Sequence, residues 1–144
     1  MFEISEVDAT TPKISAILHG MNGRSPDLFP PLLERHLESG FWWLAMHERN
    51  PVGFAGLVAM EPFANVGYLK RCYVMPDHRG HGLQYRLLMA RELKARQLGW
   101  STLVSETKAD NTHSASNFRK AGFEQCEPEQ KWARDSIYWV KHLF

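Results

Sequence analysis

The chain has 144 residues, 44% of them hydrophobic and 23% charged, which is enough for one folded domain with a substantial core. Seventeen Lys and Arg residues against sixteen Asp and Glu residues give a net charge of +1, which argues against a nucleic-acid partner. The N-terminal residues lack a basic and apolar leader, no apolar run approaches the ~20 residues that cross a bilayer, and two cysteines are too few for a disulfide framework. We therefore expect a single domain over residues 1–144, located in the cytoplasm, with no membrane partner.

The first forty residues predict one strand and two helices. Apolar side chains in residues 2–7 predict a short strand. Residues 11–20 predict a helix, because Thr-Pro at the start fits N-cap and N1 and a glycine follows the apolar positions. Residues 21–29 are rich in Asn, Gly, Ser and Pro and predict a loop, whereas residues 30–40 predict a second helix that opens on Pro-Pro and closes on Gly.

The next segment predicts an antiparallel meander of three strands. Residues 41–47 and 52–60 are apolar runs, and Glu-Arg-Asn-Pro between them favours a hairpin. Residues 66–74 form the third strand, rich in apolar, aromatic and β-branched side chains.

A long helix is predicted over residues 82–98, because its leucines and alanines fall on one face. Arg91 is the one polar residue on that face. The simplest interpretation of Arg91, Lys94 and Arg96 is a solvated helix surface.

Residues 102–107 predict another strand, so that strand 66–74, the long helix and this strand form a βαβ unit with parallel strands. A short helix is then predicted over residues 111–120. A strand starting at Phe123 and a last strand over residues 132–140 complete the chain. The fold class is therefore α/β with a mixed sheet.

The loop between strand 66–74 and the long helix carries the sequence Arg79-Gly80-His81-Gly82. Glycines at this place let an anion approach the free amide groups of a helix start, so the loop is compatible with a phosphate ligand. The alternative is an ordinary turn before a helix. A metal site at His78-x-x-His81 near Cys72 is the weaker interpretation, because no second ligand pair follows at zinc spacing.

Two motifs resemble the GNAT superfamily of acetyl-coenzyme A dependent N-acetyltransferases. Residues 72–82, CYVMPDHRGHG, are similar to the pyrophosphate motif of that family, and residues 111–123, NTHSASNFRKAGF, are similar to its later helix motif. The two motifs also follow each other in the family's order, with one helix and one strand between them. The resemblance covers most of the chain from residue 41 onward.

The resemblance implies about seven mostly antiparallel strands and about four helices, with a central parallel pair that splays apart for coenzyme A. The pantetheine arm would pair with the backbone around Cys72 and Val74, and the Val74 amide would be the oxyanion donor. Acetyl-CoA would be the co-substrate, with no metal. The implied cofactor-binding residues are Cys72, Tyr73, Val74, Arg79, Gly80, His81, Gly82, Leu83, Gln84, Asn111, Ser114 and Phe118.

Three further positions bear on catalysis or on cofactor binding. Glu106 is the candidate base, because a Glu at this offset before Asn111 acts through water in members similar to ribosomal-protein N-terminal acetyltransferases; the alternative is that Ser105 or Glu106 simply faces solvent. Gln84 stands where a small residue usually follows the loop, and would either donate to a phosphate or crowd it. Phe118 stands where many members carry a Tyr that protonates the leaving thiolate.

These residues predict transfer of acetyl from acetyl-CoA to a primary amine of a small molecule or peptide. The alternative is an acyl-CoA binding or sensing module that keeps the fold but has lost transfer. Tyr68 is a weaker catalytic candidate than Glu106. The aromatic residues form either a core or an acceptor cage or homodimer surface; they include Trp42, Trp43, Trp132, Tyr138 and Trp139.

Overall fold

The structure is a computed structural model that describes residues 1–24 and 29–144. Its elements follow in the order β1 (Phe2–Val7), α1 (Pro12–Asn22), α2 (Glu34–Ser39), β2 (Phe41–His47), β3 (Asn50–Ala59), β4 (Val66–Val74), a short 3₁₀ turn η1 (Pro76–His78), α3 (Leu83–Gln97), β5 (Thr102–Lys108), α4 (Thr112–Lys120), β6 (Glu124–Cys126) and β7 (Ser136–His142). None of the helices in these described ranges is long and apolar enough to cross a membrane.

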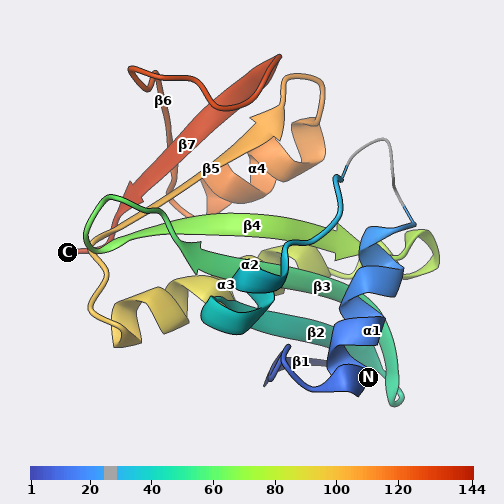
Figure 1. Ribbon diagram of the computed structural model, residues 1–144. Coiled ribbons are helices and arrows are strands. Elements are labelled where there is room, and N and C mark those ends of the chain that lie inside the picture. The colour runs from blue at the N-terminus through green and yellow to red at the C-terminus, as the bar shows by residue number, and fades with distance from the viewer. Residues whose placement is uncertain (25–28) are drawn as a thin grey trace.

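The strands form one sheet in the order β1-β2-β3-β4-β5-β7-β6. Neighbouring strands are antiparallel except β4 and β5, which are parallel because α3 carries the chain back to the same end of the sheet. Figure 1 shows that β4 and β5 start together near the C-terminus, where β7 ends, and that β5 and β7 extend from there away from β4. The predicted mixed sheet with a central parallel pair is confirmed.

Both faces of the central strands are buried, which explains why their sequences read as continuous apolar runs. In β2, Trp42 and Leu44 contact one cluster that includes α1 and α2, whereas Trp43 and Ala45 belong to a second cluster with α3 and α4. Side chains alternate between the faces of a strand, so one strand serves two cores. Helices therefore cover both faces of the sheet (Figure 1).

The interpretation of Arg91 as part of a solvated surface is wrong. Arg91 is only 2% exposed and lies among the leucines of α3 that face the sheet. Its guanidinium donates to the carbonyl oxygens of Gly56 at 3.2 Å and Arg71 at 3.1 Å, and to that of Leu87. Two carbonyl groups of the sheet and one of α3 thus surround the buried cation, which makes burial of the charge tolerable.

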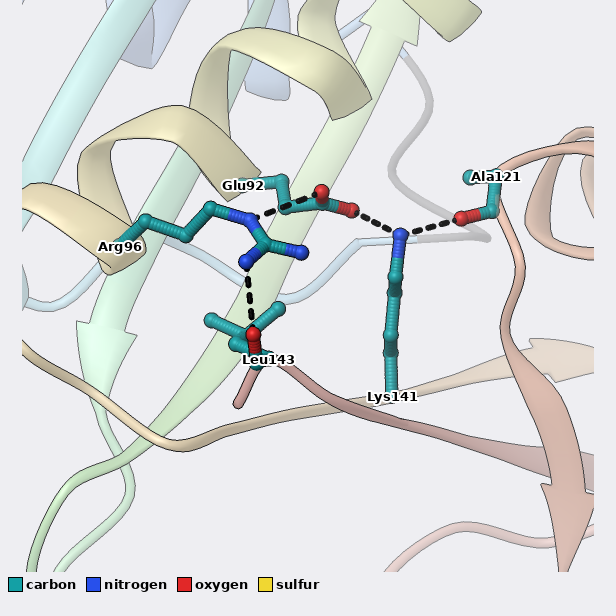
Figure 2. A network of polar contacts seen from close by, with 5 residues as sticks. All are labelled: Glu92, Arg96, Ala121, Lys141 and Leu143. Atoms are coloured by element: carbon teal, nitrogen blue, oxygen red, sulfur yellow. Dashed lines mark hydrogen bonds and ion pairs between the residues drawn. The ribbon is translucent and has the colours of Figure 1, made fainter.

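Lys94 and Arg96 also make tertiary contacts. Lys94 pairs with Glu6 of β1 at 3.2 Å. Arg96 donates to the Leu143 carbonyl oxygen, and its partner Glu92 also accepts from Lys141, as Figure 2 shows. Lys141 in turn donates to the Ala121 carbonyl oxygen at the end of α4 (Figure 2). This network ties β7 to both α3 and α4, the two helices that flank the site described below.

The first two helices differ from the prediction at their boundaries. α1 continues past Gly20 to Asn22, whose side-chain amide donates to the Pro30 carbonyl oxygen at 2.9 Å. α2 begins only at Glu34, so a helix start at Pro30 is wrong. The Pro30 carbonyl also accepts from the Arg71 guanidinium. These tertiary hydrogen bonds, and not a helical turn, fix the chain at Pro30. Of the predicted loop 21–29, residues 25–28 lie outside the described part.

Two strand boundaries also differ. The β2-β3 hairpin is tighter than predicted, because Glu48 and Arg49 both have positive φ and β3 starts at Asn50. The last strand starts at Ser136, not at residue 132. The hydroxyl of Tyr138 bonds to both the amide and the carbonyl of Ala133, so that this backbone is satisfied outside the strand ladder.

Gly56 lies where β3 packs against an aromatic ring, and Gly56→Ala is expected to lower the free energy of unfolding by about 2–3 kcal/mol. A Cβ there would lie 2.5 Å from Cζ3 of Trp42, whose indole is buried and donates to the His36 carbonyl oxygen. Urea unfolding measures the change. The control Gly20→Ala in α1 meets no atom within 4 Å and should gain about 0.5–1 kcal/mol. Equal stability of Gly56→Ala and the wild type would contradict the packing argument.

Candidate active site

β4 and β5 pair over only three residue positions before they diverge. The last pair joins Tyr68 and Val104, after which no ladder connects the two strands. The two diverging strands form a fork. At its base, the hydroxyl of the buried Ser105 on β5 donates to the Leu69 carbonyl oxygen on β4 at 3.0 Å. The open part of the fork belongs to a cavity of about 780 Å³, which extends to the glycine loop and to α4.

Beyond Tyr68, the edge of β4 that no longer pairs with β5 faces this cavity. The Met75 amide bonds to the Val52 carbonyl oxygen on β3. Because amide direction alternates along a strand, the amides of Cys72 and Val74 face the opposite side, toward the fork. The Val74 carbonyl accepts from Nε of Arg79 at 2.8 Å, which agrees with this direction. The amides of Cys72 and Val74 are thus positioned to donate to an extended ligand or an oxyanion.

The glycine loop leads from β4 into α3. Gly80 and Gly82 have φ values of 85° and 74°, so both need the left-handed conformation that glycine adopts without strain. Gly82 is the N-cap of α3, and no side chain of the described residues caps the helix. The amides of the first turn therefore remain available to an anion, and Gly80, Gly82 and Leu83 line the cavity. His81 does not line the cavity; its ring packs against that of Phe2 at a centroid distance of 4.9 Å.

Gln84 contacts α4 at the side of the cavity. Its side-chain amide donates to the Ser114 hydroxyl at 2.7 Å. Asn111 is the N-cap of α4, and its side-chain oxygen accepts from the Ser114 amide at 3.1 Å. The three polar residues thus form one chain of hydrogen bonds between the first turns of α3 and α4.

Phe118 is only 7% exposed and belongs to the core as much as to the cavity wall. Its ring stacks on Trp139 at a centroid distance of 5.6 Å and an interplanar angle of 9°. Trp42, Trp43, Tyr138 and Trp139 are likewise buried, which confirms them as core residues, whereas Trp132 is 39% exposed. The position of Phe118 carries no proton donor.

Glu106 projects into the cavity two residues beyond the end of β4-β5 pairing. Both of its carboxylate oxygens accept from the Tyr68 hydroxyl, at 2.5 and 2.7 Å. Burial, and then the negative charge of Glu106, raise the pKa of Tyr68 well above its usual range. Tyr68 therefore stays protonated and holds the carboxylate in one orientation. Its ring packs against Trp132.

Arg71 is a residue of the site that sequence reasoning missed. It occupies the β-bulge of β4, where the register to β3 shifts, and its φ is 58°. Its guanidinium donates to Asn22 at 2.9 Å and Pro30 at 3.0 Å and lies over the Phe29 ring. Burial lowers the pKa of Arg71, while the charge of nearby Glu106 acts in the opposite direction. A sequence signal that could have pointed to Arg71 is its place next to Lys70, because two adjacent cations are unusual in an otherwise apolar strand.

The cavity wall is rich in cations. Among the described lining residues Glu106 is the one carboxylate, whereas Arg71, Arg79, Arg91 and Lys108 supply positive charge. The described residues hold no group of three or more His, Cys, Asp or Glu side chains that could bind a metal ion.

The cavity brings together nearly all residues that the sequence singled out. Its wall includes the candidate base and eleven of the twelve candidate cofactor residues, His81 being the exception. They are Cys72, Tyr73, Val74, Arg79, Gly80, Gly82, Leu83, Gln84, Glu106, Asn111, Ser114 and Phe118.

The sequence of the chain also matches a known protein family. The sequence model described as the acetyltransferase (GNAT) family matches residues 13–123, which is most of the chain. The chain belongs to this family. The matched range contains the fork, the glycine loop of this GNAT protein and the helix that begins after Asn111.

Three relatives of this GNAT protein are informative. A mycothiol acetyltransferase from Saccharomonospora viridis is 33% identical over 67% of the chain, which spans only 29% of that relative's length. An aminoglycoside N(6')-acetyltransferase type 1 from Stenotrophomonas maltophilia is 28% identical, with 73% of this chain and 76% of that one covered. The crystal structure of a GNAT family acetyltransferase from Elizabethkingia anophelis with acetyl-CoA bound has a TM-score of 0.73 at 22% identity, covering 99% and 98% of the two chains.

Proposed function

We propose that this GNAT protein transfers an acetyl group from acetyl-CoA to a primary amine. The observation that carries the proposal is one continuous cavity with free helix-start amides at one end, free strand amides in the middle and Glu106 in the fork. The amides after Arg79 suit a diphosphate, and the gap beside β4 suits an extended amide-bearing arm.

Acetyl-CoA supplies the thioester, and the residues of the chain supply proton removal and charge stabilisation. In the transfer, the neutral amine nitrogen forms a bond to the thioester carbonyl carbon, the carbon–sulfur bond breaks, and coenzyme A leaves as a thiolate. The second proton that the nitrogen releases as the amide forms passes to the thiolate sulfur, directly or through water. Glu106 accepts the ammonium proton, directly or through water. The amide of Val74 or Cys72 polarises the carbonyl oxygen, an effect typically worth about 3 kcal/mol. A thiol with a pKa of about 8.5 leaves without help at the position of Phe118.

The test is release of free thiol from acetyl-CoA by the purified protein in the presence of amine acceptors, with calorimetric binding of acetyl-CoA in parallel. Gly82→Val forces a β-branched residue into the left-handed region and is expected to weaken acetyl-CoA binding by about tenfold or more. Gly99→Val introduces the same strain at φ 76°, after the far end of α3, and should leave binding unchanged. Absence of both turnover and acetyl-CoA binding would refute the proposal.

A second candidate function is an acyl-CoA sensor without transfer. It is favoured by Phe118, which lacks a proton donor, and by Gln84, which ties α3 to α4 beside the cofactor side of the cavity. Saturable acetyl-CoA binding without thiol release across a broad amine panel would support the sensor over the enzyme.

A further inference from the structure

Arg71 is held in an unusual backbone conformation at the acceptor end of the cavity. A non-glycine residue at φ 58° costs free energy, and such residues cluster at functional sites. Buried Arg91 supports the bulge by binding the Arg71 carbonyl oxygen. Contacts with Asn22, Pro30 and Phe29 fix the guanidinium before any ligand arrives. The Arg71 side chain is therefore preorganised.

The guanidinium of Arg71 retains hydrogen-bonding capacity. Arginine has five N–H donors, and the described contacts use one on Nε and one on Nη2. No carboxylate within residues 1–24 and 29–144 forms an ion pair with Arg71. A half-buried guanidinium with spare donors is a typical partner for a planar carboxylate.

Glu106 provides the opposite charge in the same cavity. An ammonium group next to Glu106 and an anionic group next to Arg71 would satisfy both residues at once. A polycation such as an aminoglycoside would meet one carboxylate and several like charges on the described wall, which disfavours it.

We propose that Arg71 binds a carboxylate of the acceptor, so that the acceptor is a small primary amine bearing a carboxyl group, as in an amino acid. This inference rests on the proposed acetyl transfer and adds its acceptor class. Glu106 then receives the amino group while Arg71 orients the other end of the molecule. The alternative role for Arg71 is only to tie α1 to the following segment through Asn22 and Pro30.

The experiment compares amino acids with the amines that remain when their carboxyl groups are removed. For the best pair, such as phenylalanine and phenethylamine, kcat/KM of the wild type should be at least about tenfold higher for the carboxyl-bearing member. Arg71→Gln should reduce this ratio toward one, and Arg71→Lys should retain part of it. Arg35→Gln, which removes an exposed arginine of α2 outside the cavity wall, should leave the ratio unchanged.

Several outcomes would overturn the inference while acetyl transfer still stands. These are a wild-type ratio of one or less, turnover of an aminoglycoside in place of both members, or an unchanged ratio in Arg71→Gln. A purely structural role would alter turnover of both members equally. Thermal melting checks that each variant folds, and if Arg71→Gln does not, the wild-type ratio and Arg71→Lys decide. Failure of every acceptor refutes the proposed function itself.

Discussion

Replacing Glu106 by glutamine is expected to lower kcat/KM for an amine acceptor about 100-fold at neutral pH. The amine arrives mainly as an ammonium ion, and Glu106 is the one carboxylate on the described cavity wall that can take its proton. Glutamine keeps the size of the side chain and can still accept from the Tyr68 hydroxyl. The loss therefore reports on proton removal more than on packing.

The pH dependence of the Glu106→Gln variant distinguishes a role of Glu106 in proton removal from a purely structural role. Above the pKa of the acceptor the amine is already neutral, so the defect should shrink steadily as the pH is raised toward about 10. A defect that stays constant with pH would indicate a structural role and contradict the assignment. Glu106→Asp should be intermediate, because it keeps the charge and shortens the reach. Calorimetry should show acetyl-CoA affinity close to that of the wild type in both variants.

Arg91→Met is expected to lower the free energy of unfolding by about 3 kcal/mol, because it removes the hydrogen-bond donor of two buried carbonyl groups. The variant leaves the carbonyl oxygens of Gly56 and Arg71 without their donor, beneath α3, and an unsatisfied buried group costs about 1–3 kcal/mol. Methionine removes a buried charge as well, which offsets part of this loss. Because the bulge loses its support, kcat/KM should also fall in the fraction that folds.

Urea unfolding of Arg91→Met is best compared with Lys94→Met on the same helix. Lys94 pairs with Glu6 near the surface, and exposed pairs contribute about 0–1 kcal/mol. Equal effects of the two substitutions would show that desolvation of the Arg91 guanidinium cancels its hydrogen bonds. A larger effect of Arg91→Met would establish the buried arginine as the support of the bulge.

The glycine loop and the start of α4 could be predicted from the sequence, because their signals are local. Gly80 and Gly82 mark a turn with positive φ before a helix, and Asn111 marks a helix N-terminus, so both can be recognised within a few residues. The contact between Tyr68 and Glu106 was not predictable in this way. Tyr68 and Glu106 are 38 residues apart, and their contact depends on where two strands stop pairing.

Patterns in the sequence are enough to predict the order of the elements, the apolar central strands and the glycine loop, because periodicity and turn chemistry act over short distances. The contacts of Arg71 and Arg91, in contrast, depend on the tertiary fold. Arg91 lies on an apolar helix face, where its charge would ordinarily argue for solvent, yet bulge carbonyls from two strands surround it. Those strands come together only when the sheet forms, so no local pattern around either arginine encodes these contacts.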